Sequence, residues 1–115
     1  MQYFIVAEYV WIGGSGSAED LRSKARTLTG PIYGIQDIPE WSYDGSSCGQ
    51  ATADSSDVKL KPVHMFPDPF RGNPHILVLC ESIDSQNIPI ASNFRHYADE
   101  LTKLVQINDI WIGFE

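Results

Sequence analysis

The chain has 115 residues and a mass of 12.9 kDa, the size of one domain, which argues against an enzyme built from two domains around a cleft. Hydrophobic residues make up 43% and charged residues 20%, a composition typical of a folded protein and not of a disordered one. The formal net charge of −7 would repel phosphate backbones and anionic lipids, so we expect no nucleic-acid partner and no membrane partner.

The longest apolar runs, at residues 3–7 and 76–80, have five residues each, whereas a membrane-spanning helix needs about twenty. The N-terminus lacks the basic flank and the small-residue cleavage site of a secretory signal, so we expect a cytoplasmic protein. Cys48 and Cys80 lie in different sequence contexts and form no Cys-x-x-Cys pair. Both are therefore expected to be reduced thiols.

The first half of the chain contains one clear strand and one ambiguous segment. Residues 2–12 are rich in Ile, Val, Tyr and Trp and predict a β-strand, which the glycine cluster at 13–16 ends. Such a cluster permits either a hairpin turn or a phosphate-binding loop. Residues 18–28, with Ser17 as a cap, favour a helix by local propensity alone. The abundance of Ser, Gly, Asp and Ala at 41–57 predicts a long exposed loop.

The second half predicts two strands and a helix. Residues 58–66 alternate as a strand, with Pro62 indicating an edge or a bulge, and 75–83 form the most apolar strand. Apolar residues at helical spacing within 94–105 define one face of a helix, for which Ser92 is the expected N-cap. Residues 109–115 are strand-like. This order predicts an α+β domain, a small mixed sheet with one helix packed on it.

Common catalytic and metal-binding motifs are missing from the sequence. Glu19 stands where a dinucleotide-binding fingerprint needs Gly or Ala, and no phosphate-binding Gly-Lys-Ser or Gly-Lys-Thr occurs. His64, His75 and His96 have no partners at zinc spacing, so we expect ordinary surface or strand-end roles for them. Cys48 lacks a nearby histidine in the sequence that would activate it as a nucleophile.

The run WSYDGSSCGQA at residues 41–51 is the most informative stretch, because two aromatic residues flank a carboxylate that glycine and two hydroxyls follow. Together with residues 7–16, 20–28 and 68–73, it resembles the N-terminal part of eukaryotic-type glutamine synthetase, with all four motifs in the family's order. Residues 111–115 are similar to the first strand of that family's catalytic domain.

The resemblance implies an α+β fold of the β-grasp (ubiquitin-like) type, a mixed sheet with one packed helix, over residues 1–91. Residues 92–115 would then form a helix and the first strand of a catalytic domain that is absent from this chain. By the same resemblance, the glycine cluster at 13–16 is a hairpin turn, and residues 20–28 pair with the first strand despite their helix propensity.

The resemblance also implies a reaction. In this family ATP, with Mg²⁺ or Mn²⁺, phosphorylates glutamate and ammonia displaces the phosphate, at interfaces between subunits of homo-oligomeric rings, here expected to be decamers. Asp44 matches the residue that binds ammonium and takes its proton, Ser47 matches a serine that assists, and Glu115 matches the first metal ligand of a Glu-x-Glu pair. The chain alone is expected to bind no cofactor and to be inactive as a ligase. Arg71 is expected to stabilise a turn against Asp68 and not to bind substrate.

Other interpretations remain open at this stage. Residues 44–47 could form a plain turn with an Asx hydrogen bond and have no catalytic role. The chain could be a short non-catalytic module that binds or regulates full-length glutamine synthetase subunits. It could also be an unrelated ubiquitin-like adaptor that shares only the fold.

Overall fold

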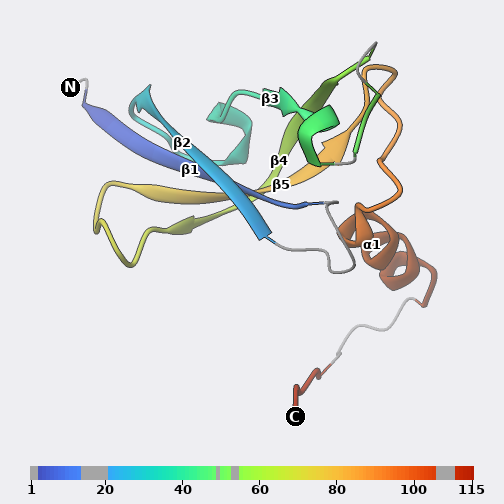
Figure 1. Cartoon of the computed structure of the whole chain (residues 1–115). Helices are drawn as coiled ribbons and strands as arrows, with labels where there is room; N and C mark the ends of the chain where they lie inside the picture. Colours follow the sequence, from blue (N-terminus) through green and yellow to red (C-terminus); the bar gives the residue numbers. More distant parts are fainter. Residues whose placement is uncertain (1–2, 14–20, 49, 53–54, 106–110) are drawn as a thin grey trace.

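A computed structural model describes residues 3–13, 21–48, 50–52, 55–105 and 111–115. Five strands form one curled sheet in the order β2-β1-β5-β4-β3, in which β1 and β5 are parallel and the other neighbours are antiparallel (Figure 1). The predicted mixed sheet with one helix is thereby confirmed. The elements are β1 (Phe4–Ile12), β2 (Leu21–Thr29), β3 (Trp41–Asp44), β4 (Asp57–Pro67), β5 (Ile76–Ile83), α1 (Phe94–Val105) and the 3₁₀ turns η1 (Ile35–Asp37) and η2 (Gly45–Cys48).

The segment with helix propensity is a strand, as the family resemblance implied. β2 pairs with β1 over nine residues, from Phe4 opposite Thr29 to Ile12 opposite Leu21. Pairing along this whole edge satisfies backbone groups that a helix would bond internally, and tertiary context of this kind overrides local propensity. Asp20 and the glycines at 14 and 16 lie outside the described residues, so the hairpin turn stays a prediction.

The prediction of a loop throughout residues 41–57 is wrong, because the stretch begins with β3. Trp41 and Tyr43 alternate with Ser42 and Asp44, and β3 pairs antiparallel with β4. The two aromatic side chains point into the core, which gives this short segment enough buried surface to hold it as a strand. The small polar residues around them concealed this alternation in the sequence.

The bulge predicted at Pro62 is present. The register of β4 against β5 shifts between Pro62 and His64. Proline has no N–H to donate to the ladder, so a bulge accommodates it inside a strand that is hydrogen-bonded along most of its length.

The sheet curls until its two edge strands meet. The Lys24 ammonium of β2 lies 3.7 Å from the ring centroid of Trp41 and donates a hydrogen bond to the carbonyl of Ser42 in β3. Between these edges lie the fully buried side chains of Tyr9 and Leu60. The edge contact closes the core on one side of the sheet.

Helix α1 forms where predicted, but its N-cap differs from the prediction. The helix begins after Asn93, whose Oδ1 accepts the His96 N–H at 3.3 Å, whereas the Ser92 hydroxyl accepts a hydrogen bond from Gln50. The apolar face does not pack on the sheet: Leu101 is 62% exposed and Leu104 78%. Instead the polar face points to β5, because Arg95 and His96 both approach a buried carboxylate there.

The strand predicted at the last five residues is not formed. Residues 111–115 are neither helix nor strand, and Trp111 is 93% exposed. A strand needs a neighbour to satisfy its backbone groups, and none of the five described strands pairs with this segment.

The turn between β4 and β5 is held as expected. The buried carboxylate of Asp68 accepts the N–H groups of Phe70 and Arg71 at 2.8 and 3.1 Å and one Arg71 guanidinium nitrogen at 2.7 Å. The guanidinium also pairs with Glu8 of β1 at 3.0 Å. Arg71 therefore has the structural role that the sequence predicted.

Candidate functional site

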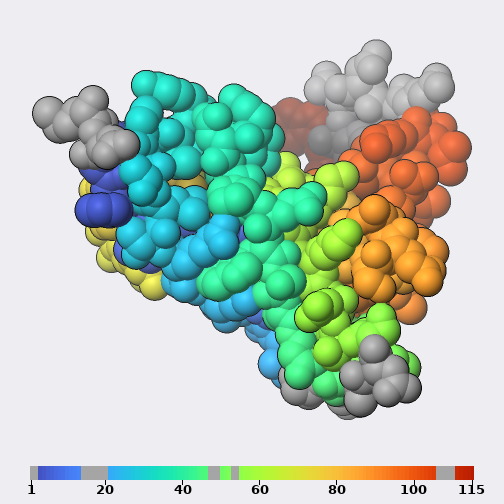
Figure 2. Space-filling model, turned by 90° about the horizontal axis from the view of Figure 1, so that it is seen from above, coloured from blue at the N-terminus to red at the C-terminus, as the bar shows by residue number. Residues whose placement is uncertain are grey.

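Strand β3 places Asp44 at the molecular surface. Its alternation turns Trp41 and Tyr43 inward, which leaves Ser42 and Asp44 exposed. The green segment of β3 and η2 accordingly reaches the molecular surface in Figure 2. On β4 the register partner of Asp44 is Asp57, so a second acidic residue stands directly opposite. Two neighbouring carboxylates make the local potential negative, which attracts cations.

A local turn fixes the Asp44 carboxylate. The backbone N–H and the hydroxyl of Ser46 both donate to Asp44 Oδ1, at 3.0 and 2.6 Å. These two hydrogen bonds, the hydroxyl's first, hold the pKa of Asp44 below its usual range. Asp44 is therefore an ionised, exposed carboxylate at neutral pH, and its turn is the Asx arrangement considered above.

Gly45 allows the loop to approach the core. Its N–H donates to Ser56 O at 2.7 Å, and its carbonyl accepts the N–H groups of Gln50 and Ala51 at 2.8 and 3.1 Å. A Cβ at this position would stand 2.4 Å from Cγ2 of Val58, a fully buried side chain. Only glycine therefore lets the loop lie this close to β4.

The structure places the predicted site residues in two segments. Asp44 ends β3, and Ser47 follows within η2, so both belong to one turn, although the side chains of Ser47 and Cys48 lie outside what the structure describes. Glu115 lies in the exposed segment without a strand. In the described part of the chain, no three His, Cys, Asp or Glu side chains are grouped closely enough to hold a metal. The metal-binding role of Glu115 stays a prediction.

Sequence reasoning missed Gln50, which ends the loop at residues 44–50, called the candidate loop below. Its side-chain amide bonds with three other segments: Tyr43 on β3, Ile12 at the end of β1, and Ser92 before α1. A glutamine in a polar loop carries no signal of such contacts. Only the tertiary structure shows that these segments converge.

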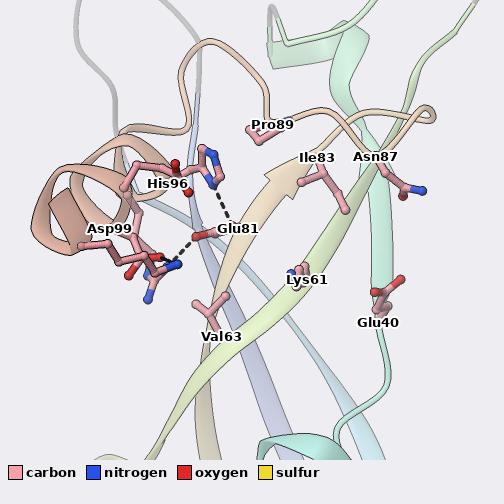
Figure 3. A pocket seen from close by; sticks show the side chains of 12 residues that line it. Glu40, Lys61, Val63, Glu81, Ile83, Asn87, Pro89, His96 and Asp99 are labelled. Atoms are coloured by element: carbon pink, nitrogen blue, oxygen red, sulfur yellow. Dashed lines mark hydrogen bonds and ion pairs between the residues drawn. The ribbon is translucent and has the colours of Figure 1, made fainter.

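A charged hollow of about 600 Å³ lies elsewhere, between α1 and the outer side of β4 and β5 (Figure 3). At its wall Glu81 accepts a hydrogen bond from Arg95 at 2.5 Å and lies 3.6 Å from His96 Nδ1. Acidic and basic side chains both line the hollow, among them Lys61 and Asp99. Asp44 is not part of it.

Cys80 and His75, two residues considered in the sequence analysis, lie within the described part of the chain. Cys80 is a free, buried thiol. His75 Nδ1 accepts the Val6 N–H at 2.9 Å, which is the strand-end role expected of that histidine. Among the described residues, no helix has the length and apolar character needed to cross a membrane.

Comparisons with known proteins identify relatives along nearly the whole chain. The profile of the glutamine synthetase β-grasp domain matches residues 4–85. The chain is 52% identical to a cytosolic glutamine synthetase isozyme of Oryza sativa subsp. japonica and 48% identical to a glutamine synthetase of Colletotrichum gloeosporioides, in each case over 96% of its own length. A chloroplastic leaf isozyme of Hordeum vulgare is 45% identical.

The chain spans about 30% of the length of these relatives, 31% of the rice protein and 26% of the barley one. Identity at this level along 96% of the chain argues against an unrelated adaptor that shares only the fold. The matched region contains β1 to β5 and the loop with Asp44. The chain therefore belongs to the glutamine synthetase family and carries that family's N-terminal β-grasp domain.

Proposed function

We propose that this domain supplies the ammonium-binding loop for the ATP-dependent ligation of ammonia to glutamate, at an interface with another subunit. Asp44 binds the ammonium ion and accepts its proton, and Ser47 assists. The observation that carries the proposal is the exposed Asp44 carboxylate, held ionised by Ser46 and placed opposite a second acidic residue. A buried carboxylate at this position would have excluded this role.

The chemistry has two stages with opposite demands. A lowered pKa at Asp44 favours capture of a cation, because the carboxylate stays charged. Proton removal from ammonium demands a stronger base. Enclosure by a second subunit would strip water from the carboxylate and raise its pKa, so the same group would turn from a binding site into a general base as the nitrogen attacks.

The other reactants belong to the remainder of the enzyme. ATP, glutamate and divalent metal would be held by the part of the relatives' length that this chain does not span. Glu115 would add one carboxylate to a metal site that polarises phosphate oxygens, and no set of ligands within the described residues completes it. The chain alone should therefore form no glutamine. Assembly into homo-oligomeric rings, decamers in our prediction, and a cytosolic location belong to the same proposal.

The test is a chimera that joins residues 1–115 to the remainder of the rice cytosolic isozyme, which is 52% identical over the shared region. We expect this chimera to make glutamine. The Asp44→Asn variant should lose about 10²- to 10⁴-fold in kcat/KM for ammonium, the usual effect of removing a general base.

Asp84→Asn is a matched control for that test. Asp84 Oδ1 also closes a turn, by accepting the N–H groups of Gln86 and Ile88 at 2.8 and 2.9 Å. This variant should keep the activity of the chimera. If Asp44→Asn kept it as well, the proposed role would be wrong, and the interpretation as a non-catalytic binding or regulatory module would gain support.

A further inference from the structure

The side chain of Gln50 joins three segments that are distant in sequence. Its Nε2 donates to Ile12 O at 3.0 Å and to Ser92 Oγ at 2.9 Å. Its Oε1 accepts the hydroxyl proton of Tyr43 at 2.6 Å. The end of β1, the inner face of β3 and the residues before α1 therefore meet at one amide group.

The backbone of Gln50 closes the candidate loop. Its N–H donates to Gly45 O at 2.8 Å, and the next residue, Ala51, donates to the same carbonyl. Gly45 follows Asp44 directly. The carbonyl group to which Gln50 donates therefore belongs to the residue next to the Asp44 carboxylate. A side chain that fixes Gln50 thereby fixes both ends of the turn.

The contact with Ser92 links the loop to the start of α1. Asn93, which caps the helix, is 3% exposed and donates its amide to Ser82 O of β5 at 3.0 Å. The residues before the helix are therefore anchored on the sheet. Gln50 ties the loop to this anchored point and not to a freely moving chain.

We propose that Gln50 is a positioning residue that holds the Asp44 turn against β1 and against the residues before α1. This inference rests on the proposed function of Asp44. An amide with two donors and one acceptor satisfied in a partly buried site has one favoured orientation, because any rotation breaks at least one of its hydrogen bonds to Ile12, Ser92 or Tyr43. Without the amide the loop would sample other conformations, and the Asp44 carboxylate would occupy a wider range of positions.

The experiment is an NMR comparison of the 115-residue chain with its Gln50→Ala variant, under conditions in which both are folded. Amide exchange at Gly45 and Ala51 should become about tenfold faster in the variant, as local opening grows easier. The pKa of Asp44, measured by carboxyl titration, should rise toward the ordinary value of about 3.9, because Ser46 would donate to it less often. Ser92→Ala, which removes a single partner, should change both quantities in the same direction by less.

Gln86→Ala is the matched control, since this exposed glutamine makes no side-chain hydrogen bond among the described residues. It should leave the Asp44 pKa and both exchange rates unchanged. A purely stabilising role for Gln50 would lower the melting temperature without moving the Asp44 pKa, and that outcome would overturn the inference.

Experiment can distinguish a failure of the role proposed for Asp44 from a failure of the role proposed for Gln50. In the chimera, Gln50→Ala should raise KM for ammonium several-fold and leave KM for glutamate unchanged. If Asp44→Asn had no effect on activity while the NMR changes occurred, the function assigned to Asp44 would be wrong and the positioning by Gln50 would stand. If the NMR quantities did not change, the positioning role would be wrong whatever the kinetics.

Discussion

Trp11 of β1 and Tyr43 of β3 stack with ring centroids 4.6 Å apart and planes inclined by 24°, although β5 and β4 lie between their strands in the sheet. The curl of the sheet brings them together. The pair connects the centre of the core to the residue directly before Asp44. The rigidity of the candidate site therefore depends on the same aromatic packing that stabilises the fold.

Variants of Tyr43 separate the contribution of its hydroxyl to stability from that of its ring. Tyr43→Phe keeps the stacking on Trp11 and loses the hydroxyl that bonds Gln50 and Ser82, so we expect a loss of about 1 kcal/mol in the free energy of unfolding. Tyr43→Ala also removes the ring and should cost about 3–5 kcal/mol. Urea denaturation measures both values. Equal losses in the two variants would show that the ring contributes nothing to stability.

Gly45→Ala should disturb the loop through the core. The added Cβ would meet Val58 Cγ2 at 2.4 Å and the Cβ of Ala51 at 3.1 Å. We expect a loss of about 1–3 kcal/mol in the free energy of unfolding, the usual cost of overpacking. Gly113→Ala is the control, because nothing lies within 4 Å of its added Cβ. Equal stability of the two variants would contradict the close approach of the loop to β4.

The composition of the long strands β1, β4 and β5 is what allows the sequence to predict them. β1, β4 and β5 carry enough Ile, Val, Leu and aromatic residues to be recognised without the tertiary structure. β2 has nine residues of helix-compatible composition, and only the family resemblance indicated a strand. What decides its conformation is the edge of β1, which is a property of the fold and not of the segment.

The candidate site was predictable in part. Asp44 could be identified from the motif, and its exposure follows from the alternation with Trp41 and Tyr43. The contacts of Gln50 could not be predicted, since they join segments up to 42 residues apart. The orientation of α1 could not be predicted, because apolar spacing identifies a helical face but not the surface that this face contacts.

The buried Asp68 should make stability depend on pH in the acid range. The Arg71 guanidinium, with two backbone N–H groups, holds the pKa of Asp68 below its unfolded value of about 3.9. Its contribution to stability is therefore complete above that unfolded value and is lost as the pH falls through the folded pKa.

Asp68→Asn tests this dependence. The variant should be less stable than the parent at pH 7, and the difference should shrink as the pH falls below about 4. Arg71→Gln leaves the backbone donors in place and should give an intermediate slope. Denaturation midpoints between pH 7 and pH 2.5 measure the effect. A difference between Asp68→Asn and the parent that stays constant over this range would contradict the assigned ionisation of Asp68.

Cys80 should be chemically inert while the chain is folded. The side chain is 3% exposed, and burial raises the pKa of its thiol to about 12. At pH 8 its thiolate fraction is then about three orders of magnitude below that of an ordinary cysteine, and the thiolate is the reactive form. A Cys48→Ser variant isolates this thiol. Its alkylation by iodoacetamide should be at least a hundredfold slower in the folded chain than in urea, with N-acetylcysteine as the control for reagent activity. Rates within tenfold of each other would show that Cys80 is reached by solvent and that β5 is not packed as described.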